Sequence, residues 1–372
     1  MSYLGEDIGK LGFGLMRLPK EGDRIDVEQV KKMVDRFLEA GFTYFDTAWA
    51  YEGSEEAARE ALVERHPRES YQLATKCAAW IDCDTADQAK RQLQVSLDRT
   101  GAGYFDFYLL HNLGETRTDA FDRFGMWDWV QEQRECGLVR HAGFSFHSTA
   151  DELDRLLDAH PEMEFVQLQI NWADWESPSI QSRACLEVAR AHGKPVVIME
   201  PVKGGLLANP PEPVRDVFRA AEPDSSFASW ALRFAASQPG VITVLSGMSD
   251  MAQVEDNVRT MGGFKGLTAE QEQVVEGAQR ALASVPLIPC TTCNYCAKVC
   301  PKDVSVPGTF ESLNLFTLYG NRETAAAKMR TLADRNGRAL PDQCVKCGAC
   351  EAACPQHIAI REELDRAVEA LL

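Results

Sequence analysis

The chain has 372 residues, of which 45% are hydrophobic and 26% charged, a composition typical of a soluble globular protein. Its formal net charge is −17, and residues 284–372 hold ten basic and ten acidic side chains, so the acidic excess belongs to residues 1–283. An acidic surface repels phosphate backbones, which argues against nucleic-acid binding. The sequence contains neither a secretory signal nor a run of about 18 apolar residues that could span a membrane, so we expect a cytoplasmic protein.

Residues 26–260 alternate helical segments with short apolar strands. In the first unit, Asp26 begins a run with apolar residues on one face, Gly41 ends it, and a strand follows at 43–45. The other predicted strands are 11–15, 72–75, 105–110, 139–143, 165–170, 196–199 and 241–246. Eight strands alternating with helices over about 250 residues favour a parallel (β/α)8 TIM barrel. A doubly wound sheet is the competing fold, but no G-x-G-x-x-G follows the first strand.

Helix starts and lengths fit the same alternation. Thr85 and Gln88 form a predicted capping box for a helix that ends near Arg99, and Ser54 is a predicted cap for the helix before it. Further helices are predicted at 149–159, 180–191 and 226–237.

Four polar residues lie where predicted strands end. Asp46, Lys76 and His111 each follow a strand directly, and Tyr51 lies five residues beyond Asp46. In a closed barrel these ends share one rim, where such a set could protonate a carbonyl oxygen as hydride reaches its carbon. We expect Lys76 to lower the pKa of Tyr51, Asp46 to hold Lys76, and His111 to orient the substrate. Singly, each residue could instead cap a helix or pack in the core.

Eight of the twelve cysteines form two identical ladders, each with the spacing C-x2-C-x2-C-x3-C-P. The ladders are Cys290, Cys293, Cys296, Cys300 and Cys344, Cys347, Cys350, Cys354. This spacing is typical of two 4Fe-4S clusters, in which the fourth cysteine of each ladder binds the cluster of the other. Cys354 would then join the first three cysteines of the first ladder, and Cys300 those of the second. The alternatives are structural zinc or disulfides.

The remaining cysteines, Cys77, Cys83, Cys136 and Cys185, lack ligand spacing and are interpreted as ordinary thiols. We expect the barrel domain to comprise residues 1–283 and a ferredoxin-type domain to comprise residues 284–372, with the linker at 284–289. The segment between the ladders has helical composition at 309–319 and 322–335. The C-terminal domain is therefore predicted to be a mostly α-helical, ferredoxin-like unit.

Three segments resemble the active-site segments of the aldo/keto reductase family. They are Asp46-Thr47-Ala48-Trp49-Ala50-Tyr51-Glu52-Gly53, Ala74-Thr75-Lys76 and Leu109-Leu110-His111-Asn112. The opening Gly12-Phe13-Gly14-Leu15-Met16-Arg17-Leu18-Pro19 resembles the first strand of that family. The whole chain is similar to the branch that carries a C-terminal ferredoxin-type 4Fe-4S domain. The resemblance implies that Asp46, Tyr51, Lys76 and His111 are a catalytic tetrad and that NAD(P)(H) carries the hydride.

The same resemblance implies a set of cofactor contacts. Ser145 and Gln169 match residues that contact the nicotinamide carboxamide, and the loop from Glu200 to Gly205 matches the one that passes the pyrophosphate. The other implied contacts are Gly14 and Asp46, with Gly247, Ser249, Gln253 and Asn257 on the adenosine side. Met199 stands where many members stack a tyrosine on the nicotinamide. The basic pair that some members use for a 2′-phosphate is absent, so the preference between NADH and NADPH stays open.

Four tryptophans fall in loops just after strand ends: Trp49, Trp80, Trp172 and Trp175. They could form a flat pocket for a hydrophobic or aromatic carbonyl or alcohol substrate, or pack against the barrel itself.

Hydride moves two electrons together, whereas 4Fe-4S clusters pass one at a time, so direct coupling needs a splitter such as a flavin. No flavin motif is visible. Three hypotheses follow: an oxidoreductase whose clusters relay electrons to or from a partner protein, a carbonyl reductase with structural clusters, or a non-catalytic electron carrier or docking protein.

Overall fold

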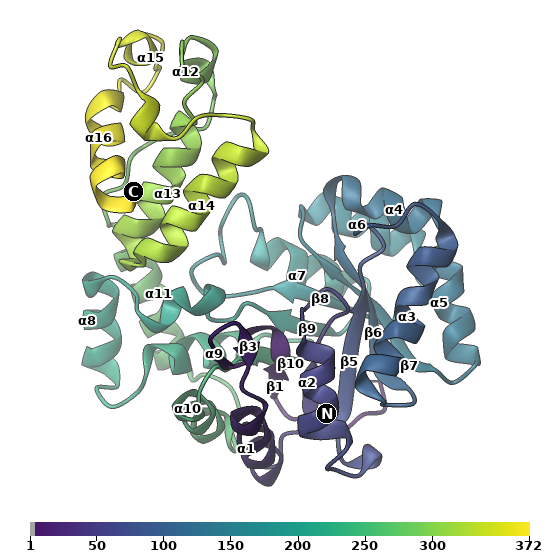
Figure 1. Ribbon diagram of the computed structural model, residues 1–372. Helices are drawn as coiled ribbons and strands as arrows, with labels where there is room; N and C mark the ends of the chain where they lie inside the picture. Colours follow the sequence, from purple (N-terminus) through teal and green to yellow (C-terminus); the bar gives the residue numbers. More distant parts are fainter. Residues whose placement is uncertain (1–3) are drawn as a thin grey trace. The chain divides into compact units, whose positions relative to one another are not determined.

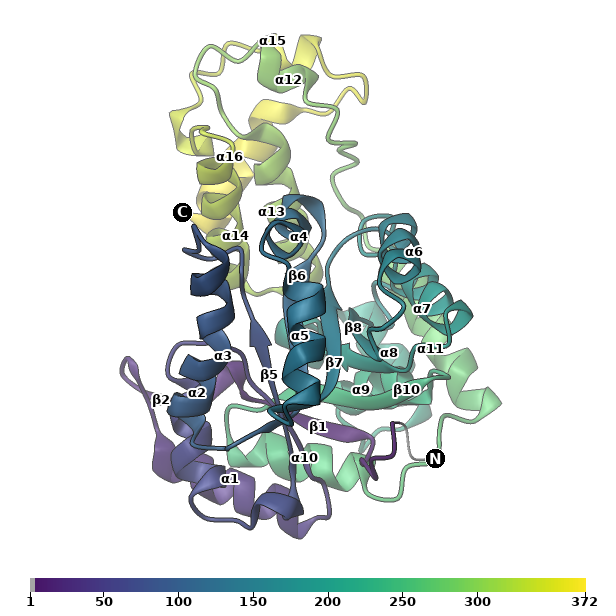
Figure 2. The ribbon, with the colours of Figure 1, turned by 90° about the vertical axis from the view of Figure 1, so that its right-hand side faces the viewer.

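The computed structural model describes residues 4–372, the side chain of Glu115 excepted. Eight strands form a closed parallel barrel in the order β1-β10-β9-β8-β7-β6-β5-β4 (Figures 1 and 2). The strands are β1 Leu11–Gly14, β4 Tyr44–Asp46, β5 Gln72–Cys77, β6 Phe105–Leu113, β7 Val139–Phe146, β8 Phe165–Gln169, β9 Val196–Met199 and β10 Val241–Gly247. The predicted TIM barrel is confirmed. A two-stranded hairpin, β2 Lys20–Glu21 and β3 Arg24–Ile25, follows the first barrel strand.

Helices separate the strands as the alternation predicts. They are α1 Val27–Glu39, α2 Ser54–Ala58, α3 Ala86–Thr100, α4 Thr118–Arg123, α5 Met126–Glu135, α6 Ala150–Ala159, α7 Ser182–Ala191, α9 Phe227–Ser237 and α10 Met251–Met261. The capping box of Thr85 and Gln88 is present at α3. The cap predicted at Ser54 is wrong: Gly53 is the N-cap, and the Ser54 hydroxyl instead donates to the Leu15 carbonyl at 2.9 Å.

The barrel interior is filled by side chains that point inward from the strands. A buried apolar cluster consists of Tyr44, Ala74, Phe107, Leu109, Phe165, Val197, Ile242 and Leu245. Gly143 makes room for Phe165, because a Cβ atom at this glycine would lie 2.5 Å from the Phe165 carbonyl oxygen and 2.6 Å from its ring. Larger residues are excluded at this position, and the barrel is a packed core that leaves chemistry to its rim.

The strands that carry the candidate site run further than predicted. Lys76 lies inside β5, paired with Leu109, whereas a strand end was expected before it. His111 lies within β6 at an irregularity in the pairing with β7, between Leu110 and Leu113. Asn112 there has φ +62°, and its N–H donates to the Ser145 hydroxyl at 2.7 Å. A side-chain acceptor thus replaces a strand partner and keeps β6 attached to β7 beyond the apolar run.

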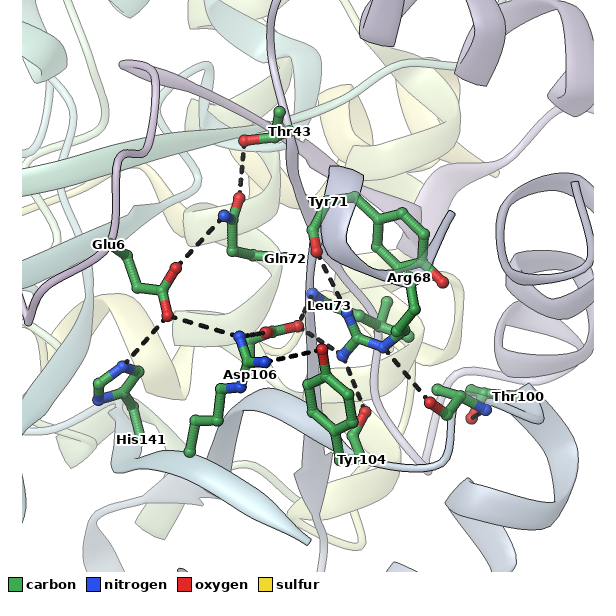
Figure 3. Close-up of polar contacts among 12 residues, drawn as sticks. Glu6, Thr43, Arg68, Tyr71, Gln72, Leu73, Thr100, Tyr104, Asp106 and His141 are labelled. Atoms are coloured by element: carbon green, nitrogen blue, oxygen red, sulfur yellow. Dashed lines mark hydrogen bonds and ion pairs between the residues drawn. The ribbon is translucent and has the colours of Figure 1, made fainter. Parts of the chain in front are cut away.

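The N-terminal ends of the strands carry a polar network (Figure 3). Its centre is Asp106, which is 1% exposed. The carboxylate accepts from Arg68 at 2.6 Å, from Arg140 at 2.9 Å and from the Leu73 N–H at 2.9 Å. The network lies at the barrel end where side chains serve stability rather than catalysis in TIM barrels.

The chain forms two compact units, the second comprising 206–224 and 276–372. Its helices are α8 Glu212–Ala221, α12 Tyr295–Lys298, α13 Val306–Tyr319, α14 Arg322–Arg335, α15 Ala349–Ala352 and α16 Ile360–Leu371, while α11 Ala269–Ala283 begins in the first unit. The predicted helical character of the C-terminal region is confirmed, although α13 begins earlier than expected. Nowhere in residues 4–372 is there a helix with the length and apolar content that crossing a membrane requires.

Candidate functional site

The centre of the barrel rim is a buried ion pair between the ends of β4 and β5. The Lys76 ammonium lies 2.5 Å from Asp46 Oδ1 and also donates to the Thr47 carbonyl at 2.7 Å. The other Asp46 oxygen accepts from Gln167 Nε2 at 3.1 Å. Lys76 is 0% and Asp46 3% exposed, so burial makes both charges costly unless they are paired. The site fixes the position of one cation.

Tyr51 and His111 lie beside that cation. The Lys76 ammonium is 4.9 Å from the centroid of the Tyr51 ring. The rings of Tyr51 and His111 meet edge to face, with centroids 5.7 Å apart and planes at 81°. The loop after β4 holds Tyr51 in place through its N–H, which donates to the Ala48 carbonyl at 2.9 Å. The structure thus brings together all four side chains that the sequence predicted to share a rim.

Burial decides the protonation of this group. Burial raises the pKa of Tyr51, and the Lys76 charge offsets only part of the effect. The expectation that Lys76 lowers this pKa below its ordinary value is therefore wrong for the free protein. Burial is the largest single influence on Lys76 and opposes its charge, but Asp46 and Tyr51 together outweigh burial, so the pKa of Lys76 is raised. Burial also raises the pKa of Asp46, whereas the Lys76 charge and the hydrogen bonds from Lys76 and Gln167 lower it. The contact of 2.5 Å between the Lys76 ammonium and Asp46 Oδ1 is that of an ion pair.

His111 is held neutral. Burial lowers its pKa well below the ordinary value, and the nearby Lys76 cation acts in the same direction. Its Nδ1 atom is buried without a hydrogen-bond partner among the described residues. A buried polar atom without a partner is uncommon in proteins, and a catalytic role is one of its explanations. The rim therefore offers a protonated phenol next to a neutral imidazole, the combination that can hold and protonate a carbonyl oxygen.

The residues matched to the nicotinamide lie at the ends of β7, β8 and β9. Gln169 and Met199 are partners across the β8–β9 pair. Gln169 Nε2 donates to the Glu200 carboxylate at 3.0 Å. Ser145 is fully buried, and its hydroxyl accepts from the Asn112 N–H, so it is engaged with the backbone of β6. Gly205 has φ +97°, a conformation that a side chain would strain.

The residues matched to the adenosine lie around the start of α10. Gly247 ends β10 opposite Gly14 of β1. The Ser249 hydroxyl donates to the Arg17 carbonyl at 2.7 Å, and the Ser249 N–H donates to the Gln253 side chain at 2.9 Å. Asn257 is only 5% exposed and donates to the Ser246 hydroxyl at 2.9 Å. Asn257 therefore has a core hydrogen bond, and the three other residues lie at the surface of the rim.

The four predicted substrate tryptophans have different environments. Trp80 is 37% exposed, and its indole donates to the His111 carbonyl at 2.9 Å. Trp49 has a buried Nε1 without a hydrogen-bond partner in the described part of the chain. Trp175 is half-buried and packs edge to face on Phe234 at 5.2 Å. Trp172 is 1% exposed, so the expectation that it faces a substrate is wrong; it belongs to the core.

Two rim residues were missed by sequence reasoning. Arg17 lies against Gly247, and its guanidinium would be 3.2 Å from a Cβ atom at Gly204, so the cation spans two loops at the rim. His147 follows β7 and lines a hollow together with Gln169. Burial lowers the pKa of His147. A signal for both existed, since each comes within four residues of the end of a predicted strand, at 11–15 and 139–143.

The eight ladder cysteines line two cavities, and each cavity takes its fourth cysteine from the opposite ladder. The first contains Cys290, Cys293, Cys296 and Cys354. The second contains Cys300, Cys344, Cys347 and Cys350. Val306 lines both cavities. This is the crossed grouping that the sequence predicts.

The surroundings of the cysteines suit a thiolate cluster. The Val304 N–H points at Cys300 Sγ at 3.3 Å, and the Lys346 N–H at Cys344 Sγ at 3.4 Å. Such N–H···S contacts stabilise cluster-bound sulfur. All twelve cysteines are unpaired thiols, which contradicts a disulfide framework. Among residues 4–372, no three His, Cys, Asp or Glu side chains converge closely enough to hold a single metal ion.

Comparisons with known proteins agree with the predicted identity of both the barrel and the cysteine-rich C-terminal region. Residues 10–278 match the model of the aldo/keto reductase family, and residues 289–359 match that of a 4Fe-4S dicluster domain. The chain is 31% identical over 182 residues to the aldo-keto reductase AKR2E4 of Bombyx mori, covering 46% of this chain and 56% of that protein. It is 25% identical over 301 residues to the uncharacterized oxidoreductase YqkF of Bacillus subtilis, covering 73% and 92%.

Solved structures show the same barrel. The holo form of aldo-keto reductase AKR11C1 from Bacillus halodurans matches with a TM-score of 0.60 and 24% identity, over 74% of this chain and 93% of that one. An aldo/keto reductase from Klebsiella pneumoniae, in complex with NADP and acetate, matches with a TM-score of 0.57 and 19% identity, over 73% and 92%. The chain is therefore an oxidoreductase of the aldo/keto reductase family, joined to a C-terminal domain of the 4Fe-4S dicluster type.

Proposed function

We propose that the barrel interconverts a carbonyl compound and an alcohol with NAD(P)(H). The observation that carries this proposal is the buried cluster of Asp46, Lys76, Tyr51 and His111 on one rim. A bound nicotinamide would supply the hydride. His111 would hold the substrate oxygen through an imidazole N–H, and Tyr51, whose ring lies against that of His111, would give that oxygen its proton. Lys76, held by Asp46, would stabilise the phenolate that Tyr51 leaves behind.

The rim residues fit a dinucleotide. The cation of Arg17 near Gly204 and the left-handed turn at Gly204 and Gly205 suit a diphosphate that approaches the backbone closely. Gly14 and Gly247 keep side chains away from the adjoining strand ends, and Ser249 and Gln253 offer polar groups there. We propose this path for the cofactor, from Ser145, Gln169 and Met199 to the start of α10, with Asn257 supporting it from the core. Binding of NADP to the Klebsiella relative is consistent with the path.

We also propose two 4Fe-4S clusters, one in each four-cysteine cavity, within a ferredoxin-type domain at 284–372 that follows a barrel domain at 1–283. Supporting this are the crossed cavities and the dicluster family match. Cys293 and Cys347 are exposed, and the apolar side chains of Tyr295 and Val345 near them are exposed as well. The helices α12 and α15, which follow these cysteines, lie side by side (Figures 1 and 2). An electron-transfer partner could reach both clusters on this surface.

Electron relay between hydride chemistry and the clusters needs a two-electron to one-electron splitter, and we propose a flavin in that role, bound by this chain or its partner. The second candidate is a carbonyl reductase whose clusters are structural; the apolar packing of Val306, Phe310 and Ile360 around the cysteines favours it. Both assign the protein to the cytoplasm, where thiols stay reduced. Trp49, Trp80 and Trp175 are proposed to face a substrate with a flat apolar part.

One experiment tests these proposals. The protein is purified without oxygen, its iron and flavin contents are measured, and NAD(P)H oxidation is followed with a panel of carbonyl compounds. We expect about eight iron atoms per chain and a turnover that Tyr51→Phe reduces to a small residual rate. Turnover in Tyr51→Phe at the wild-type rate, or an iron-free protein, contradicts the proposal. Cluster reduction by NAD(P)H would favour relay; clusters whose spectrum ignores NAD(P)H and substrate would favour a structural role.

A further inference from the structure

Glu200 occupies an unusual position on the rim. It follows β9 with φ +54°, in the left-handed region that glycine adopts more readily. Its carbonyl accepts from the Lys203 N–H at 3.0 Å and from Asn171 Nδ2 at 3.4 Å, so the loop fixes this backbone. Strained residues of this kind concentrate at functional sites. The strain here places an exposed carboxylate beside Gln169, whose Nε2 donates to it at 3.0 Å.

The charge of this carboxylate reaches the reacting groups. Burial is the main reason that the pKa of Tyr51 is raised. The carboxylates of Asp46 and Glu200 also raise this pKa, whereas the Lys76 ammonium lowers it. Burial lowers the pKa of His147, and Glu200 opposes that effect. Asp46 is buried and neutralised by Lys76, whereas Glu200 forms no ion pair with any residue in 4–372. Glu200 is therefore the unpaired negative charge that acts on the site.

The proposed function supplies the group on which this charge would act. A nicotinamide that passes hydride to a carbon whose oxygen is held at Tyr51 must lie next to Tyr51, within the same field. The oxidised ring is positively charged and the reduced ring is neutral, whereas the diphosphate charge is the same in both. A carboxylate therefore distinguishes the two forms. Resting on the proposed function, we propose that Glu200 stabilises the oxidised form of the bound nicotinamide and so poises the site for carbonyl reduction.

The test compares binding of the oxidised and reduced nucleotide, so it does not depend on turnover. NAD⁺, NADH, NADP⁺ and NADPH are titrated into the full-length holoprotein without oxygen, by calorimetry or fluorescence, for the wild type and Glu200→Gln. Glutamine keeps the acceptor oxygen for Gln169 and removes only the charge. We expect the ratio of Kd for the oxidised form to Kd for the reduced form to rise about tenfold, equal to about 30 mV for a two-electron couple.

Glu176→Gln is the matched control, because Glu176 is an exposed rim-loop carboxylate that is paired with Arg183 at 2.8 Å. It should leave the ratio unchanged, and Glu200→Asp should retain most of the wild-type ratio. If wild type binds both forms and Glu200→Gln leaves the ratio unaltered, the role of Glu200 is refuted while the proposed function stands. An equal change in Glu176→Gln refutes it as well. If no nucleotide binds the wild type, the proposed function itself fails.

Discussion

Replacement of Lys76 by methionine removes the cation that lies beside Tyr51. The ammonium is 4.9 Å from the centroid of the tyrosine ring. At this separation two unit charges attract by about 3 kcal/mol for an effective dielectric constant near 20, which corresponds to roughly 10²- to 10³-fold in an equilibrium or a rate. Lys76 should stabilise the phenolate that forms as Tyr51 gives up its proton. We therefore expect Lys76→Met to lower kcat/KM for carbonyl reduction by about that factor.

The pH profile gives the sign of the effect. Lys76 counteracts the burial that raises the pKa of Tyr51, so its removal raises that pKa further. The alkaline loss of reductase activity, which marks deprotonation of the acid, should therefore move to higher pH in Lys76→Met. The assay is NAD(P)H oxidation between pH 6 and 11, with circular dichroism on the same samples to establish that the barrel is folded.

Two further variants distinguish the loss of the Lys76–Tyr51 interaction from the effect of leaving a buried charge unpaired. Lys76→Met leaves Asp46 charged and buried, with Gln167 as its remaining side-chain partner, so the double variant Asp46→Asn/Lys76→Met restores neutrality. In a Tyr51→Phe background, adding Lys76→Met should lower kcat/KM only slightly further, because the effects of substituting residues that act together are not additive. If Lys76→Met slows Tyr51→Phe by another two orders of magnitude, or leaves the wild-type rate and pH profile unchanged, Lys76 does not act through Tyr51.

Three other predictions follow from the remaining parts of the molecule. Asp106→Ala should lower the free energy of unfolding, measured with denaturant, by about 3 kcal/mol, because Arg68 then lacks its carboxylate partner beside a buried cavity. A change below about 0.5 kcal/mol would show that the network is dispensable. Because burial holds the pKa of His111 well below 6.5, kcat/KM should show no acidic limb near that pH; a limb there that disappears in His111→Asn would contradict a neutral imidazole. Cys354→Ser should remove about half of the iron, whereas Cys136→Ser, which changes an exposed thiol outside the ladders, should remove none; full iron in Cys354→Ser would refute the crossed grouping.

The parts of the fold that depend on local pattern could be predicted from the sequence. The apolar runs located every barrel strand, and the capping box located the start of α3. The end of β6 was misplaced because His111 and Asn112 are polar, and polarity in the sequence indicates a strand end. The strand continues because Ser145, which is 33 residues away from Asn112, accepts its N–H. Such a partner cannot be identified from the segment itself.

The candidate site shows the same division. The order of strand ends was enough to group Asp46, Lys76 and His111, since a barrel places all such ends together. The pKa of Tyr51 was predicted in the wrong direction because the sequence shows a neighbouring charge but not the depth of burial. Trp172 was misassigned for the same reason. Glu200 acquires its significance from a left-handed backbone and from Gln169, neither of which leaves a signature in composition or spacing.

The exchange of one cysteine between the two ladders constrains how the protein can mature. Each cavity is complete only when cysteines more than forty residues apart along the chain have met, with α13 and α14 between them. Under the proposed assignment of two clusters, metal loading would follow the meeting of these segments. Both cavities depend on the same contact between the two ladders, so oxidative damage at one cavity would also destabilise the other. The two cavities would then form and unfold together.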